Sequence, residues 1–276
     1  DNDECLIKTI KIDGVPLQEL DSLLAEIENF YGWDSFKQHV RRMVSSYNMI
    51  ISRKKYSLKA AAPNLNTIIV GNTGTGKTTA ANYLAKLYKA MGYLKSAYVS
   101  ITPISDLTST ININGEAEAT KSALNSAEGR ALILENAHLL HNHDNKNYNP
   151  EDKVISAIVD YLNNTTPGNM MVALVGYPSG ITTVLASRPE LRKHFPEPIV
   201  LEDFKPKELC QIAQSYCSNN DLELSDEARK KLETYILHKY NLRGPDFENA
   251  WFVQRLFDDQ IVPKMSERLS RVDSFS

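Results

Sequence analysis

Cysteine is scarce in this chain of 276 residues, which contains only Cys5, Cys210 and Cys217. Their spacing matches no metal-binding pattern, and a small, odd number of cysteines argues against a disulfide framework. Such scarcity is typical of a reducing compartment. We therefore expect a cytoplasmic protein, and a nuclear location also fits.

Long apolar runs are also missing, since no stretch approaches a membrane span and no signal peptide opens the chain. Hydrophobic residues make up 42% of the chain and charged residues 24%, as in a soluble globular protein. The net charge of -3 gives no excess of positive charge for nucleic acid or an anionic membrane. We expect neither as a partner. Because the chain begins at Asp1 without Met, we also expect it to be part of a longer protein.

One glycine-rich stretch gives the clearest functional signal. Two glycines separated by four residues, followed by Lys and Thr, fit the P-loop pattern. Residues 67–70 before it are apolar and β-branched, as in a buried strand, and residues 80–87 after it favour a helix. Strand, glycine loop and helix in this order predict a nucleoside triphosphate site rather than a chance turn. The stretch consists of Gly71, Asn72, Thr73, Gly74, Thr75, Gly76, Lys77, Thr78 and Thr79.

The chemistry of such a loop follows from its backbone. Glycines let successive N–H groups point inward, and the following helix N-terminus adds partial positive charge, so the loop attracts phosphate. We expect Lys77 to reach the β- and γ-phosphates and the Thr78 hydroxyl to coordinate Mg²⁺. The sequence therefore predicts binding of a nucleoside triphosphate together with Mg²⁺.

Apolar strand patterns alternate with helical patterns through the first two hundred residues. This alternation predicts an α/β fold, with a parallel sheet covered by helices on both faces. Helices are expected at residues 17–29 and 34–50, and residues 107–118 are polar enough to predict a loop. The expected strands are residues 67–70, 96–101, 131–134, 169–176 and 199–201.

The last seventy residues have a different character, because strand patterns stop after residue 206. Three helical patterns follow, at residues 209–217, 228–240 and 247–269. The predicted organisation is an N-terminal arm (1–18), an α/β nucleotide-binding domain (19–204) and a C-terminal helical lid domain (205–276).

A P-loop α/β domain with a helical lid resembles the AAA+ superfamily. The order of several short strings resembles one branch of it, that of the red-type Rubisco activases and stage V sporulation protein K, from about residue 20 to about residue 269. These strings are Ser105-Asp106-Leu107, Val175-Gly176-Tyr177, Pro189-Glu190-Leu191-Arg192, Asp203-Phe204 and Leu224-Ser225-Asp226-Glu227-Ala228.

The resemblance implies a fold, a ligand and partners. It implies the AAA+ strand order with the P-loop strand central, ATP as the nucleotide, and hexameric rings with nucleotide between subunits. Partners would be other AAA+ modules, in a homo- or hetero-oligomeric ring or in the same longer chain, and a protein client that is remodelled. It also places Tyr31, Gly32 and Trp33 where the family borders the adenine. Tyr31 and Trp33 fit equally well as core aromatics, so both interpretations stay open.

The second catalytic motif departs from the family pattern. An apolar strand should end in Asp-Glu, with the Asp serving Mg²⁺ and the Glu polarising the attacking water. Here residues 131–134 are followed by Glu135 and Asn136. Glu135 can still serve the metal, but the Asn136 amide cannot accept a proton at neutral pH. A one-residue shift that makes Glu135 the base is the alternative, and it would put Leu134 at the metal position.

Three further positions that the family uses in hydrolysis are altered. His194 stands where the resemblance implies an arginine finger, with Arg192 as a neighbouring substitute. Trp251 replaces the lid arginine that senses the γ-phosphate, and a Trp offers one donor and no charge. The first pore loop, residues 108–115, contains no aromatic residue. Parts that bind triphosphate are kept, and parts that cleave it are changed.

Three hypotheses follow. The first is an ATP-binding AAA+ module with degenerate hydrolytic residues and a regulatory or structural role in a protein-remodelling ring. The second is an active remodelling ATPase with relocated groups, in which Glu135 is the base and Arg188 or Arg192 the finger. The third is a scaffold that no longer depends on nucleotide, which the intact P-loop argues against.

Overall fold

The computed structural model describes residues 17–109, 115–141, 149–244 and 246–270. They group into two compact units. The second unit combines the loop Asn72–Gly76 with the residues from Glu202 onward, and the first contains the remaining residues up to Leu201. Most of the expected N-terminal arm and most of the expected pore loop lie outside the described residues.

The first unit is built on a parallel sheet with the strand order β2-β3-β4-β1-β5. All residues of β1 and β4 are buried, as expected for a sheet covered on both faces. The P-loop strand β1 is interior, but the middle position belongs to β4, which corrects the expectation that β1 is central. The strands are β1 (Thr67–Gly71), β2 (Val99–Pro103), β3 (Ala131–Glu135), β4 (Met171–Gly176) and β5 (Ile199–Leu201).

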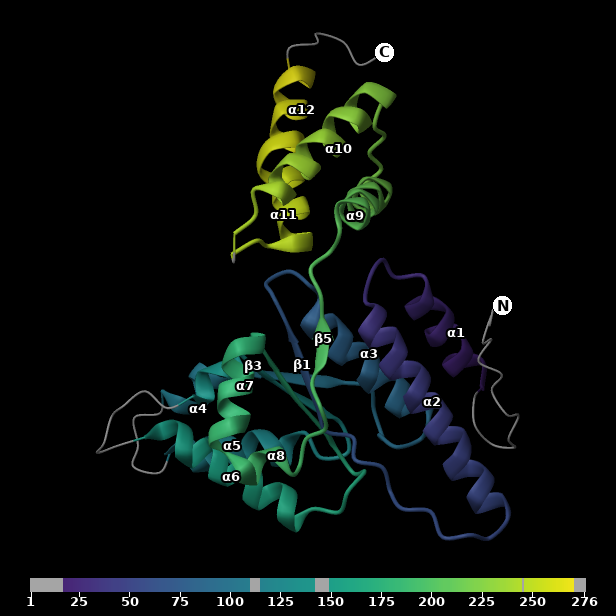
Figure 1. The fold of residues 1–276 in the computed structure, drawn as a ribbon, viewed down its shortest axis with the longest axis vertical. Coiled ribbons are helices and arrows are strands. Elements are labelled where there is room, and N and C mark those ends of the chain that lie inside the picture. Colours follow the sequence, from purple (N-terminus) through teal and green to yellow (C-terminus); the bar gives the residue numbers. More distant parts are fainter. Residues whose placement is uncertain (1–16, 110–114, 142–148, 245, 271–276) are drawn as a thin grey trace. The chain divides into compact units, whose positions relative to one another are not determined.

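Two helical layers cover the sheet, and each encloses its own apolar core (Figure 1). The first layer contains α1 (Leu17–Glu28), α2 (Asp34–Lys55) and α3 (Lys77–Ala90), which begins directly after the P-loop. The second layer contains α4 (Ile104–Thr108), α5 (Gly115–Ser126), the 3-10 turn η1 (Ala137–Leu140), α6 (Pro150–Asn164), α7 (Pro178–Ser187) and α8 (Pro189–Arg192). The fold is therefore the predicted α/β arrangement.

The second unit contains the helices of the C-terminal region. The single helical pattern expected over residues 247–269 is divided, because a π-helical segment, η2 (Leu256–Ile261), separates α11 (Asn249–Arg255) from α12 (Val262–Leu269). Ser225 caps α10 by accepting a hydrogen bond from the Ala228 amide at 3.2 Å. The remaining helices are α9 (Pro206–Asn219) and α10 (Asp226–Asn241).

Three local expectations were wrong. Part of the loop expected at residues 107–118 is helical, because α4 ends at Thr108 and α5 begins at Gly115. The second strand begins at Val99, three residues later than expected. Helix α7 was not expected at all. None of the helices within the described ranges has the length and apolar character needed to cross a membrane.

Candidate functional site

The first unit brings Thr78 and Glu135 into direct contact at the carboxyl edge of the sheet. Thr78 lies in the first turn of α3 and Glu135 is the last residue of β3. The Thr78 hydroxyl donates a hydrogen bond to Glu135 Oε1 at 2.6 Å. A hydroxyl and a carboxylate side by side are hard oxygen ligands of the kind that Mg²⁺ prefers in sites it shares with a phosphate. The two residues therefore fit the metal role that the sequence predicts for them.

Lys77 precedes this pair and is partly buried. Burial lowers its pKa, and the nearby negative charge of Glu135 acts in the opposite direction. The Lys77 ammonium nitrogen lies 5.3 Å from the centre of the Tyr177 ring, which follows β4. A partly desolvated cation gains more from an anionic ligand than a solvated one does. This environment suits an ammonium group that binds phosphate.

His138 and Tyr177 form an aromatic wall beside Lys77, and the sequence analysis assigned no role to His138. Their rings meet edge-on, with centroids 4.8 Å apart. Burial lowers the pKa of His138, and the Lys77 charge lowers it further. A Cβ on Gly180 would lie 2.5 Å from the His138 Cβ, so this glycine makes room for the imidazole. The position of Gly176 and Gly180 at and just after the end of β4 was the only sequence signal of this packing.

The backbone conformation at position 136 favours Asn. Its φ of 56° is left-handed, and Asn136 is the residue before the turn η1. Asn tolerates this region better than other residues with a Cβ. Its side chain is exposed. The amide thus stands next to Glu135 in the chain without the proton-accepting capacity of a carboxylate.

The glycine loop belongs to the second unit and is held tightly there. Gly74 and Gly76 have φ values of 70° and 89°, which favour glycine. A Cβ on Gly74 would lie 1.9 Å from the carbonyl oxygen of Glu248, so no larger residue fits. Thr75 is fully buried, and its hydroxyl donates to the Asn72 carbonyl at 2.9 Å. The loop conformation therefore requires glycine at position 74 and favours it at position 76.

Two other predicted nucleotide contacts, Thr79 and Trp251, are both exposed. Thr79 is exposed on α3. Trp251 lies in α11, where its side chain is 58% exposed, and its backbone N–H donates to the Glu248 carbonyl at 2.9 Å. An exposed indole adds apolar surface but no positive charge for a phosphate.

Tyr31 and Trp33, the two aromatic residues expected near the adenine, have different surroundings in the segment after α1. Gly32 and Trp33 both have left-handed φ values, 63° and 61°. The Trp33 ring meets Phe30 and Phe36 edge-on, with centroids 5.1 and 5.3 Å away, so Trp33 behaves as a core aromatic. Tyr31 is 37% exposed.

The residues expected near an arginine finger lie at the opposite edge of the sheet from Glu135. The His194 carbonyl accepts hydrogen bonds from the side-chain amides of Asn64, at 2.8 Å, and Asn66, at 3.3 Å. Asn66 directly precedes β1, so His194 lies near the amino ends of the parallel strands. The structure does not bring His194 or its neighbour Arg192 together with Glu135.

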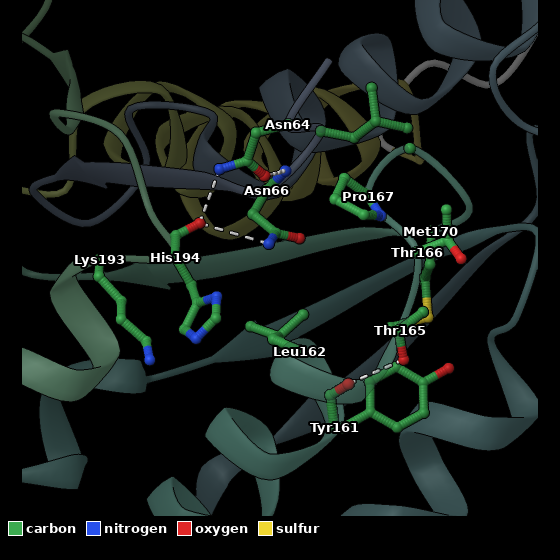
Figure 2. Close-up of a pocket in the computed structure, with 12 residues that line it drawn as sticks. Asn64, Asn66, Tyr161, Leu162, Thr165, Thr166, Pro167, Met170, Lys193 and His194 are labelled. Carbon is green, nitrogen blue, oxygen red and sulfur yellow. Dashed lines mark hydrogen bonds between the residues drawn. The ribbon is translucent and has the colours of Figure 1, made fainter. Parts of the chain in front are cut away.

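The His194 imidazole points into a cavity of about 170 Å³ within the first unit (Figure 2). Its Nε2 is buried and has no hydrogen-bond partner among the described residues. Burial lowers the pKa of His194, and the charge of Lys193 lowers it further. The side chain is therefore a neutral, inward-facing group and a poor substitute for a guanidinium fork.

The two candidate finger arginines have different surroundings. Arg188 forms an ion pair with Asp152, and the other oxygen of that carboxylate accepts from the Asn149 amide at 2.9 Å. Arg192 lies 3.8 Å from Glu197, and both of these side chains are exposed. Arg188 is therefore bound within its own unit, whereas Arg192 is held only weakly.

We expect Arg188→Ala to lower the free energy of unfolding by about 1–2 kcal/mol, because it leaves the Asp152 carboxylate without its cation. Arg192→Ala is the matched control and should change it by less than about 0.5 kcal/mol, as for exposed pairs. Urea unfolding followed by circular dichroism measures both. Equal losses of unfolding free energy in the two variants would contradict the proposed difference between Arg188 and Arg192.

Comparisons with known proteins agree with this geometry. A family profile described as AAA domain (dynein-related subfamily) matches residues 66–144. A second profile, described as AAA lid domain, matches residues 205–275. The first covers the P-loop and the strand that ends at Glu135, and the second covers the C-terminal helices.

Several curated proteins are similar over most of the chain. Protein CfxQ of Xanthobacter flavus is 28% identical over 242 residues, which are 87% of this chain and 74% of that protein. The chloroplastic ribulose bisphosphate carboxylase/oxygenase activase of Cyanidioschyzon merolae is 26% identical over 87% of this chain and 79% of its own length. Stage V sporulation protein K of Bacillus subtilis is 25% identical over 88% of this chain and 74% of its own length.

Proposed function

Because this chain is an AAA+ module, similar over most of its length to the red-type Rubisco activases and stage V sporulation protein K, we propose that it binds ATP with Mg²⁺ and hydrolyses it slowly or not at all on its own. Its role is then regulatory or structural. It holds a nucleotide within a ring of AAA+ modules, and a neighbouring module or partner subunit supplies the turnover that remodels a protein client.

The hydrogen bond between Thr78 and Glu135 is the observation that carries this proposal. It supports a metal-serving role for the Glu135 carboxylate, which leaves the base position to the next residue, Asn136. Bound Mg²⁺ would neutralise charge on the β- and γ-phosphates. The Lys77 ammonium would balance the remaining charge, and the loop amides would orient the phosphate chain. None of these groups removes a proton from water.

The altered finger region supports the same conclusion. Removal of a general base alone lowers turnover by roughly a hundred- to ten-thousand-fold. Burial and the Lys193 charge lower the pKa of His194, which favours its neutral form, and the imidazole faces a cavity of its own unit. It is therefore unsuited to stabilise a developing phosphate charge in a neighbouring subunit. Arg192 is exposed and is the remaining candidate for a contact to another module.

The second candidate function is an active protein-remodelling ATPase in which Glu135 is the base and Arg192 or Arg188 the finger. The exposure of Arg192 favours it over Arg188, which is already paired with Asp152. The scaffold hypothesis, in which nucleotide has no role, requires that the ordered P-loop and the Thr78–Glu135 contact serve stability only.

Glu135→Gln separates these functions. The amide keeps the shape of the side chain but loses the negative charge, so we expect Mg²⁺ to improve ATP affinity less than in the parent chain. ATP turnover should stay at background in both proteins. Titration calorimetry with and without Mg²⁺, with a phosphate-release assay on the same samples, measures both quantities. Measurable turnover in the parent chain would contradict the proposal, and its loss in Glu135→Gln with an unchanged effect of Mg²⁺ on ATP affinity would support the relocated-base alternative instead.

A further inference from the structure

Asn249 makes the densest set of hydrogen bonds in the second unit, and the sequence analysis gave it no function. Its side-chain amide is fully buried and its φ of 51° is left-handed. The amide nitrogen donates to the Thr73 carbonyl at 3.0 Å and to Asp203 Oδ1 at 2.9 Å. It also lies 3.3 Å from the Phe247 carbonyl. The amide oxygen accepts from the Phe204 backbone N–H at 3.0 Å.

These contacts use both the N–H donors and the oxygen acceptor of the Asn249 side-chain amide. Asn is the shortest side chain that offers two N–H donors and an acceptor on one planar group. An Asp of the same shape has no donor when ionised, and it would place a second carboxylate beside Asp203. The buried position thus requires an amide at residue 249.

The contacts converge on the phosphate-binding loop. Asp203 Oδ1 also accepts from the side-chain amide of Asn72 at 3.0 Å. The Ala250 backbone N–H donates to the Gly74 carbonyl at 3.2 Å. Three successive loop residues, Asn72 to Gly74, are therefore held by α11 and by the residues just before α9.

The orientation of one loop amide follows from peptide geometry. In a planar trans peptide the C=O and N–H groups point in opposite directions. Because the Thr73 carbonyl points at the Asn249 amide, the N–H of Gly74 in the same peptide unit points away from Asn249. That N–H belongs to the loop that the motif predicts will surround the phosphates.

We propose that Asn249 is a positioning residue for nucleotide binding, which aims the Gly74 N–H at the phosphates and transmits the state of the loop to α11. This inference rests on the proposed ATP binding. Through Asn249, the lid helix α11 would respond to bound nucleotide without an arginine at position 251. A nucleotide that reorients the Thr73–Gly74 peptide must also change the hydrogen bonds of Asn249, and through them the start of α11.

The chain contains a reporter for this link, because Trp251 lies two residues from Asn249. The only other Trp is Trp33, so Trp33→Phe leaves an emission signal from Trp251 alone. In this parent variant we expect ATP with Mg²⁺ to change the Trp251 emission. With Asn249→Asp we expect ATP affinity to fall on the order of tenfold or more, and the emission change to disappear even at saturating ATP.

Two further variants separate positioning from folding. Asn241→Ala removes an exposed Asn at the end of α10 and should leave affinity and emission unchanged. The exchange Asn249→Asp with Asp203→Asn restores the pair between positions 249 and 203, but it lacks the donor to the Thr73 carbonyl and the acceptor for the Asn72 amide. It should recover stability more fully than it recovers ATP affinity, whereas a merely structural Asn249 would recover both equally.

Each remaining outcome has a definite meaning. Unchanged affinity and emission in Asn249→Asp would overturn the role of Asn249. So would ATP binding to the parent variant with no change in Trp251 emission. Failure of the Trp33→Phe parent and of the unmodified chain to bind ATP would instead overturn the proposed function, and this inference would fall with it.

Discussion

Replacing Asn136 by Glu should raise ATP turnover by about a hundredfold, the lower end of the range for general-base help. The substitution places a carboxylate directly after Glu135, which is already hydrogen-bonded to Thr78. It thereby restores the base while leaving the metal-serving carboxylate unchanged. We expect the gain to stay near the lower limit because His194 still faces its own cavity and contributes no positive charge.

The left-handed backbone at position 136 determines which substitution is a suitable control for Asn136→Glu. Its φ of 56° costs a residue other than Gly or Asn about 1 kcal/mol, so any larger side chain lowers stability somewhat. Asn136→Gln has the length of Glu and the same backbone cost, but it cannot act as a base. Phosphate release should rise in the Glu variant and stay at background in the Gln variant. Equal rates in the two variants would mean that position 136 does not control hydrolysis.

Replacing Lys77 by Ala should weaken ATP binding by roughly a hundredfold or more. Removing one partner of a close, desolvated charge pair costs roughly 2–5 kcal/mol, and each 1.4 kcal/mol is about tenfold in affinity. Burial already lowers the Lys77 pKa, so its charge is a cost to the folded chain before ligand binds. We therefore expect thermal stability without nucleotide to be unchanged or slightly higher in Lys77→Ala.

Lys86→Ala is the matched control, since Lys86 is exposed on the same helix and carries the same charge. Titration calorimetry should show near-parent affinity for Lys86→Ala and greatly reduced affinity for Lys77→Ala. If both variants bound ATP as the parent chain does, the scaffold hypothesis would replace the nucleotide-binding one.

Local sequence patterns were enough to predict most of the first unit. The apolar runs of β1, β3 and β4 are buried strands. In the second unit, Gly74 and Gly76 have left-handed φ angles, which suit a glycine-rich loop. Such features depend on neighbours close in the chain. The contact of Thr78 with Glu135 was also predictable in outline, because both residues follow strands whose carboxyl ends share one edge of the sheet.

Helix α7 and the π-helical segment were harder to predict. The helix contains Gly180 and the β-branched pair Thr182 and Thr183, which have low helix propensity. The two threonine hydroxyls donate to the carbonyls of Pro178 and Ser179 one turn earlier, at 2.9 and 3.0 Å. Propensity alone does not reveal that tertiary packing keeps this segment helical. In η2 the apolar pattern continues across the change in hydrogen-bond register, so periodicity gave no sign of the division.

The roles of His194 and Asn249 depend on residues far away in the chain. His194 bonds to Asn64 across 130 residues, and Asn249 bonds to Thr73 across 176 residues. Sequence patterns identified an imidazole in place of an arginine at position 194, but they gave no sign of a role for Asn249, the first residue of α11. They did not identify which way the side chains point, because burial and partners are set by the three-dimensional fold.

The chemical state of bound nucleotide is the most direct test of the central claim. The purified chain is loaded with ATP and Mg²⁺, freed of unbound nucleotide and kept for several hours. It is then denatured, and the released ATP and ADP are separated and quantified. We predict that the nucleotide is recovered as ATP. Recovery as ADP, from a chain free of contaminating ATPase as judged by a Lys77→Ala preparation, would contradict the claim and identify a working ATPase.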